Sequence, residues 1–183
     1  GPRAANKVPA AAARSTAVRA STRAGGHLHK HVARNQNYLK GRVASENARF
    51  TFKAAARGAD LRPSAQGAVN RSATSPRAQK ALADLAKYRA RPKRYSTFHN
   101  ATTTDAMYAQ AVRNNRAAIS KWLKDPKSKT ALPVPFSSQR PVGTTYRTSG
   151  VGAPGTFHPA YNGVFVLAKS PSGKFYPKTA KLD

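Results

Sequence analysis

The chain has 183 residues and a formal net charge of +27, from 33 lysines and arginines against six acidic residues. It contains no cysteine, which excludes disulfide bonds, thiolate metal ligands and a cysteine nucleophile. Leu, Ile, Val and Phe make up only 28 of the residues, a level typical of chains that are partly disordered. Because 16 of these 28 lie in residues 95–183, we expect that half to carry most of the core.

The positive charge indicates the class of partner. A field of this size draws polyanions from a distance, so it predicts a nucleic acid or a strongly acidic protein. The sequence also has no apolar run near the length that a membrane span requires, so we expect none.

The N-terminal half is predicted to hold short helices between basic linkers. Residues 1–24 carry five basic residues, no acid and no hydrophobic period, which favours a flexible basic linker. A helical pair is expected over 25–53, with a short helix over 27–33, a break at Asn35-Gln36-Asn37 and a second helix capped by Asn35 or Asn37. Residues 54–94 read as a basic, partly helical insertion, with one helix in "SPRAQKALADLAKYRAR" after Ser75.

The C-terminal half combines one clear helix with several strands. The helix is expected from Thr102, with Asp105 in its first turn, to Asp125-Pro126, and Tyr108 and Trp122 are predicted to lie in the core. The runs "TALPVPF", "VGTTYRT", "GVFVLAK" and "KFYPKTAKL" read as strands, and the "SPSG" turn predicts a hairpin over 163–182. Helices first and strands last indicate an α+β domain over residues 25–183.

Three of the five histidines fall in "GGHLHKHV". At helical spacing His27 and His31 share a face and His29 points away, so two histidines without nearby carboxylates make a poor zinc site. A histidine can instead act as a general base or acid, and an arginine can clamp a phosphate. In one straight helix His31 and Arg42 would lie about 16 Å apart, but a break between them would let both reach one cleft.

Four successive segments resemble one family: "GGHLHKHV…YLKGR", "YSTFHNATTTDAMYAQAVRNNRAAISKWL", "RPVGTTYR" and "VFVLAKSPSGKFYPKTAKL". The family comprises the pancreatic-ribonuclease-like (RNase A-like) domains at the C-terminus of bacterial contact-dependent growth inhibition toxins and other polymorphic toxins. Its catalytic histidine falls on His31, its arginine eleven residues later falls on Arg42, and its threonine falls on Thr179. Its tyrosine falls on Lys181, and the stretch 54–94 is longer than the resemblance leads us to expect.

The resemblance implies a metal-independent ribonuclease toxin with no cofactor, which cleaves RNA by attack of the 2′-hydroxyl. His31 would be the acid–base residue, Arg42 and Lys181 would stabilise charge on phosphorus, and Thr179 would position the phosphate. His27, Lys30 and Lys178 are further candidates for contacting the substrate. The resemblance also implies delivery from a bacterial cell surface or secretion system into the cytoplasm of a target cell. The toxin would be monomeric apart from a complex with its immunity protein, which we expect to be acidic.

The last strand offers a simple test of this assignment. Residues i and i+2 of a strand point to one face, so Thr179 and Lys181 should project together and Tyr176 should project from the opposite face. His99 and His158 are candidates for a second acid–base group. Two other readings remain: a non-enzymatic protein whose cations coat nucleic acid, and a metal-dependent nuclease that uses the histidine cluster.

Overall fold

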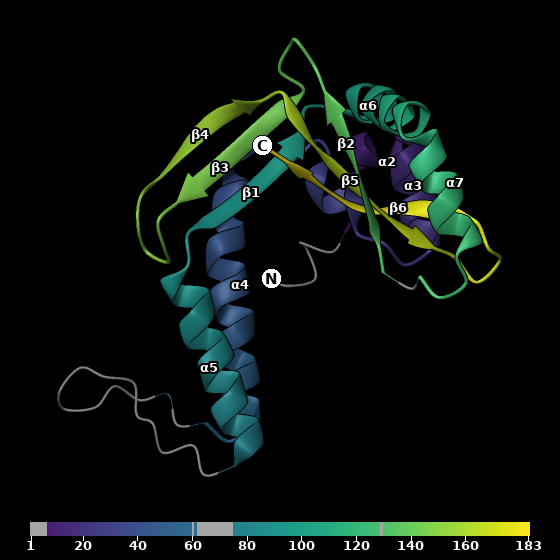
Figure 1. Ribbon diagram of the computed structural model, residues 1–183. Coiled ribbons are helices and arrows are strands. Elements are labelled where there is room, and N and C mark those ends of the chain that lie inside the picture. Colours follow the sequence, from purple (N-terminus) through teal and green to yellow (C-terminus); the bar gives the residue numbers. More distant parts are fainter. Residues whose placement is uncertain (1–6, 60, 62–74, 129) are drawn as a thin grey trace. The chain divides into compact units, whose positions relative to one another are not determined.

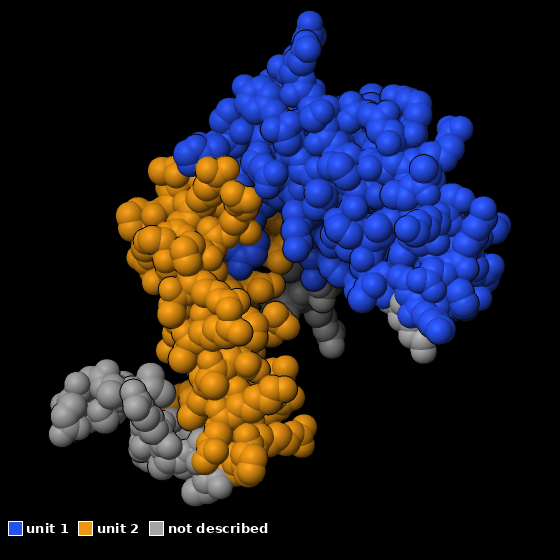
Figure 2. Space-filling view, viewed as in Figure 1, with its two compact units in different colours: residues 1–36, 95–145, 157–183 blue, residues 37–94, 146–156 orange. Residues whose placement is uncertain are grey.

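The computed structural model describes residues 7–59, 61, 75–128 and 130–183. The chain forms two compact units, coloured separately in Figure 2. Unit 1 comprises residues 1–36, 95–145 and 157–183, and unit 2 comprises residues 37–94 and 146–156.

Unit 1 is built on an antiparallel sheet in the order β2-β5-β6, made of β2 (Leu132–Ser137), β5 (Asn162–Lys169) and β6 (Phe175–Leu182). A second three-stranded sheet is not confined to unit 1: it has the order β1-β3-β4, from β1 (Lys93–Phe98), β3 (Gly143–Thr148) and β4 (Gly155–Ala160), and each of these strands contains residues of both units. The helices of unit 1 are α2 (Ala10–Ala13), α3 (Thr16–Arg23), the 3-10 helix η1 (Leu28–His31), α6 (Ala101–Asn114) and α7 (Arg116–Lys124). This combination confirms the α+β class (Figure 1).

One face of the β2-β5-β6 sheet carries the main core. Phe165 lies at its centre, with ring centroids 5.4 Å from Phe98 and 5.2 Å from both Phe136 and Tyr108. Such aromatic contacts add to the large apolar area that these rings bury. Trp122 is also buried there, so Tyr108 and Trp122 belong to the core as predicted, and burial raises the pKa of Tyr108 to about 12.

The N-terminal segment is part of this core, although the sequence favoured a flexible linker over 1–24. Ala12, Ala17 and Val18 are buried in the main cluster of unit 1. Small alanine side chains let α2 and α3 pack closely, so a segment poor in large apolar residues is still held in place. Residues 1–6 of the predicted linker lie outside the described residues.

Asp105 joins α3 to α6. Its carboxylate accepts hydrogen bonds from Ser15 Oγ at 2.6 Å and from the backbone N–H groups of Thr16 at 3.0 Å and Ala17 at 3.1 Å. It therefore caps the N-terminus of α3 rather than that of its own helix. The helix α6 starts at Ala101, one residue before the predicted Thr102. Its N-terminus is capped by Asn100, whose side chain accepts from Thr103 N.

Unit 2 contains a helical hairpin of α4 (Gln36–Ala56) and α5 (Pro76–Ala90), with Ser75 as the N-cap of α5. The two helices are joined by a stacked pair of rings, Phe50 and Tyr88, with centroids 4.9 Å apart, and by a hydrogen bond from Tyr88 Oη to the Val43 carbonyl. Buried apolar side chains, four of them alanines, continue this contact along the hairpin: Ala54, Ala59, Ala78, Ala81 and Leu85.

Most predicted elements are confirmed. The 163–182 hairpin has the register Phe165↔Ala180 and turns at Gly173, whose φ is +79°. The helix over 75–91 and the break before residue 36 also occur, whereas the predicted helix over 27–33 is a single 3-10 turn. No pattern in the sequence predicted β1 and β4, and residues 60 and 62–74 of the predicted insertion lie outside the described residues. Among the described residues no helix is both long and apolar enough to cross a membrane.

Candidate active site

The two glycines of "GGHLHKH" end α3 and let the chain turn back onto the sheet. Gly25 has a φ of +84°, and the N–H groups of Gly25 and Gly26 donate to the carbonyls of Thr22 and Ser21. This is the Schellman arrangement that terminates helices at glycine. A Cβ atom on Gly26 would lie 2.4 Å from Ser21 Oγ and 3.0 Å from the Lys178 carbonyl oxygen. Only glycine fits this approach to β6.

Backbone contacts attach the histidine segment to β6. The N–H of His27 donates to the Lys178 carbonyl at 2.8 Å, and the N–H of Leu28 donates to Ser21 Oγ at 3.2 Å. Leu28 itself is fully buried in the core. The side chains of η1 are therefore held against the C-terminal strand, about 150 residues later in the chain.

His29 has a structural role. Its ring is 6% exposed, and its Nδ1 accepts from an Arg34 guanidinium N–H at 3.2 Å, while Arg34 Nε donates to the His29 carbonyl at 3.1 Å. Burial lowers the pKa of His29 from 6.5 to about 4, and the positive charges of Arg34, Lys30 and His27 add to this effect. His29 is therefore neutral at physiological pH, where it holds Arg34 rather than acting on a substrate.

His31 has the geometry of an acid–base group. Its Nδ1 lies 3.0 Å from the backbone carbonyl of Ser96. A carbonyl only accepts, so Nδ1 carries the proton, and in the neutral ring the lone pair belongs to Nε2. A fixed tautomer of this kind is how proteins orient a histidine for proton transfer.

Ser96 connects His31 to the last strand. While its carbonyl accepts from His31, its side-chain Oγ accepts from the N–H of Leu182 at 3.2 Å. Leu182 directly follows Lys181, so a single buried serine separates the imidazole from the strand that carries the other candidates in unit 1. The structure thus connects His31 to the strand that carries Thr179 and Lys181.

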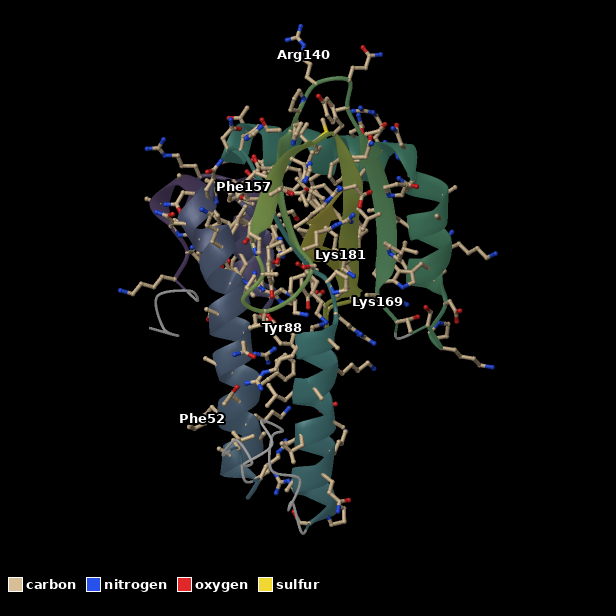
Figure 3. The ribbon with its side chains drawn as sticks, turned by 90° about the vertical axis from the view of Figure 1, so that its left-hand side faces the viewer. Phe52, Tyr88, Arg140, Phe157, Lys169 and Lys181 are labelled. Atoms are coloured by element: carbon tan, nitrogen blue, oxygen red, sulfur yellow. The ribbon has the colours of Figure 1, made fainter. Side chains whose placement is uncertain are left out.

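A β-bulge changes which side chains share a face of β6. The register shifts between Val166 and Leu167, where Val166 pairs with Thr179 and Leu167 pairs with Pro177. Lys178 is the extra residue, and cross-strand partners lie on the same face of a sheet. Figure 3 labels Lys181 on β6.

The bulge overturns the prediction that Tyr176 projects from the face opposite Thr179. Val164, Val166 and Ala168 alternate along β5 and pair with Lys181, Thr179 and Tyr176 respectively. All three β6 side chains therefore lie on the face opposite the buried Phe165 and Leu167. The sequence contained a signal for this shift, because a proline inside a strand, here Pro177, is typical of a bulge.

The remaining candidates lie at several places. Lys30 is in η1, and Lys178 is the exposed bulge residue. His99 follows β1, where its N–H donates to the Val142 carbonyl at 3.0 Å, and His158 lies in β4.

Arg42 belongs to unit 2. It lies on α4, where its guanidinium forms an ion pair with Glu46 one turn later, at 3.1 Å. Its side chain is 15% exposed. A guanidinium carries five N–H donors in all, and the contact with Glu46 is made by Nη2.

The alternative of a metal site at the histidine cluster can be compared with the part of the chain that the structure describes. No three His, Asp or Glu side chains gather there as a metal ion would need. His29 is already engaged by Arg34, so the "HLHKH" spacing does not translate into converging ligands. Without metal, the groups near β6 still offer a proton acceptor, a cation and two hydroxyls, the set that phosphodiester cleavage uses.

Comparisons with known proteins found limited likeness. No family model and no curated protein matches the sequence. Among solved structures, the chain is similar to a chain of the CdiA-CT/CdiI complex from Y. kristensenii, at 19% identity and a TM-score of 0.46. The alignment covers 85% of this chain and 92% of that chain.

Proposed function

We propose that this chain is a metal-independent ribonuclease of the RNase A-like type that acts as an interbacterial toxin. The observation that carries the proposal is the link from His31 through Ser96 to the strand of Thr179 and Lys181. The link fixes the orientation of the His31 imidazole and joins it to the strand that carries a lysine and a threonine, the residues that the sequence resemblance leads us to expect. The net charge of +27 would draw RNA to the protein.

The reaction follows from these groups. Nε2 of His31 takes the proton of a ribose 2′-hydroxyl, whose oxygen attacks the adjacent phosphorus. The bond from phosphorus to the 5′-oxygen breaks, leaving a 2′,3′-cyclic phosphate, and the departing oxygen receives a proton from a second acid, for which His99 and His158 are the candidates. Lys181 offsets the negative charge that builds on the phosphoryl oxygens, a role that the sequence resemblance also gives to Arg42. Thr179 donates its hydroxyl to one of these oxygens, and Tyr176 on the same face contacts the substrate.

A ribonuclease endangers the cell that makes it, so the proposal includes an immunity protein. An acidic partner would associate quickly with a surface of this charge, and the complex would weaken as salt rises. The toxin would be delivered from one bacterium to the cytoplasm of another, where its RNA substrate lies.

The test is cleavage of total bacterial RNA in EDTA by the wild type and by His31→Asn. Asparagine keeps an N–H donor for the Ser96 carbonyl but has no group that titrates, so the fold should persist while the rate falls by about 10²–10⁴. Thermal unfolding of both proteins checks the fold. His99→Asn and His158→Asn, assayed beside it, identify the second acid by which of them also loses activity.

Two results would contradict the proposal. Wild-type cleavage rates in the folded His31→Asn variant would remove the acid–base role. Intact RNA with the wild type, together with tight binding in a gel shift, would favour the non-enzymatic nucleic-acid-binding protein instead.

A further inference from the structure

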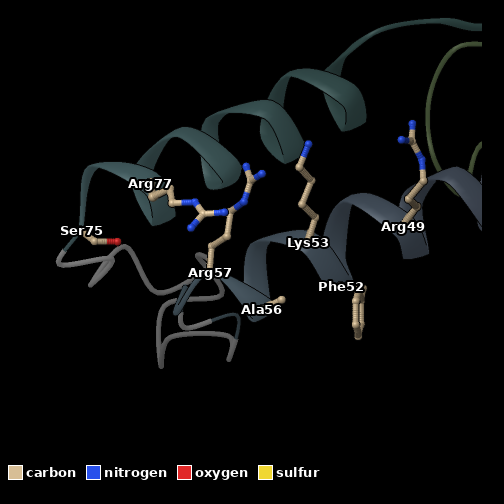
Figure 4. A pocket seen from close by; sticks show the side chains of 7 residues that line it. All are labelled: Arg49, Phe52, Lys53, Ala56, Arg57, Ser75 and Arg77. Atoms are coloured by element: carbon tan, nitrogen blue, oxygen red, sulfur yellow. The ribbon is translucent and has the colours of Figure 1, made fainter.

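The hairpin of unit 2 contains a basic groove that the proposed chemistry does not use. The groove encloses about 550 Å³ and is lined by Arg49, Phe52, Lys53, Ala56, Arg57, Ser75 and Arg77. These residues come from the end of α4 and the start of α5, and we call them the hairpin groove. Figure 4 shows Lys53 and Arg57 reaching toward α5 and Phe52 on the outer side of α4.

The positions of the cations in the hairpin groove destabilise the hairpin. Arg49, Lys53 and Arg57 follow one another at intervals of four residues, and like charges at that spacing repel each other on a helix. Arg77 lies in the first turn of α5, where the helix dipole disfavours a cation. Of these four, Arg49 meets the carboxylate of Glu46 at 3.6 Å. Such a pattern is costly for folding alone, which indicates an anionic ligand.

The spacing of the cations suits a chain of phosphates. Residues four apart on a helix are separated by about 6 Å along its axis, comparable with neighbouring phosphates of an extended strand. A line of this kind contacts successive phosphates rather than one isolated anion.

Phe52 adds an aromatic surface to the hairpin groove. Its side chain is 75% exposed, whereas the neighbouring Phe50 stacks on Tyr88 and holds the helices together. Phe52 is therefore not needed for the core of the hairpin. An exposed ring beside a track of cations is the combination by which proteins bind single strands, with the cations on phosphates and the ring against a base.

We propose that the hairpin groove is a binding site for single-stranded RNA, separate from the residues that cut it. It rests on the proposed function in that the strand held there is part of the ribonuclease substrate. The groove would retain RNA between cleavage events, which explains why the basic insertion is long.

The test measures binding of a short fluorescent single-stranded RNA to the inactive His31→Asn protein over a range of salt concentrations. The groove variant is Lys53→Gln/Arg57→Gln/Arg77→Gln, and the matched control is Lys121→Gln/Lys124→Gln/Lys127→Gln, three exposed lysines on and after α7. Both variants lose three charges, so the long-range field falls equally. We expect the groove variant to lose tenfold or more in affinity and the salt slope to fall by about 2, with a much smaller change in the control.

Phe52→Ala provides an independent readout. Loss of a stacked base should lower the affinity about tenfold, while the salt slope stays unchanged because no charge is removed. Circular dichroism of each variant checks that the hairpin remains helical.

The inference is overturned if the groove and control variants bind RNA equally. It is also overturned if the groove variant keeps its RNA affinity but loses binding to polyglutamate, because the groove would then fit an acidic protein. The proposed function can fail separately. If the wild type binds RNA through the groove but cuts no RNA, the groove inference stands and the ribonuclease proposal is contradicted. If the wild type cuts RNA and the groove variant binds RNA normally, the ribonuclease proposal stands and the groove inference is contradicted.

Discussion

An unfolded histidine takes up a proton near pH 6.5, whereas burial beside Arg34, Lys30 and His27 keeps His29 neutral down to about pH 4. Between these values the unfolded state binds one more proton than the folded state. The stabilisation that His29 provides is thus complete above pH 6.5 and is lost as the pH falls toward 4. We expect the free energy of unfolding to drop by about 1.4 kcal/mol per pH unit in this window from His29 alone. Urea unfolding of the wild type and His29→Gln at pH 7.5, 5.5 and 4.5 measures it. Glutamine does not titrate, so the variant should show a shallower pH dependence, and parallel curves for the two proteins would contradict the role assigned to His29.

At the scale of elements, α3 depends on a carboxylate from a helix far away in the sequence. Asp105 accepts three hydrogen bonds at the start of α3, two of them from backbone N–H groups. Replacing such a cap typically costs about 0.5–2 kcal/mol. We expect Asp105→Ala to lower the free energy of unfolding by about 1–2 kcal/mol and to speed hydrogen exchange in α3. Asp125→Ala is the matched control, since that carboxylate accepts one exposed hydrogen bond from Lys127 N. An equal loss in both variants would show that α3 does not rely on Asp105.

The sequence predicted an element correctly where all the residues that form its signal lie within a few positions of one another. The "SPSG" turn gave the β5–β6 hairpin, and Ser75-Pro76 gave the start of α5. Signals that depend on distant partners were not readable. Asp105 looked like a cap for its own helix because the groups that donate hydrogen bonds to it, at the start of α3, lie about 90 residues earlier in the chain. Tyr176 was assigned to the wrong face because simple alternation cannot include a bulge.

At the scale of the whole molecule, the charge of +27 was the most informative property of the sequence, and it still predicts a polyanionic partner. Hydrophobic content was a poorer guide. It favoured a flexible segment over 1–24, yet buried alanines hold α2 and α3 in the core of unit 1. It also gave no sign that residues 37–94 and 146–156 form a separate compact unit. Of the candidate site, His31 is connected to the strand of Thr179 and Lys181 through contacts of Ser96 that no sequence pattern contains.

The most direct test of the ribonuclease claim is cleavage of one RNA oligonucleotide in EDTA, compared with the same oligonucleotide carrying 2′-deoxyribose throughout. Attack by the 2′-hydroxyl predicts that the RNA is cut to fragments ending in a 2′,3′-cyclic phosphate, detected by mass spectrometry, and that the deoxy strand stays intact. Cleavage of both strands, or RNA fragments that never carry a cyclic phosphate, would contradict the proposed chemistry of His31.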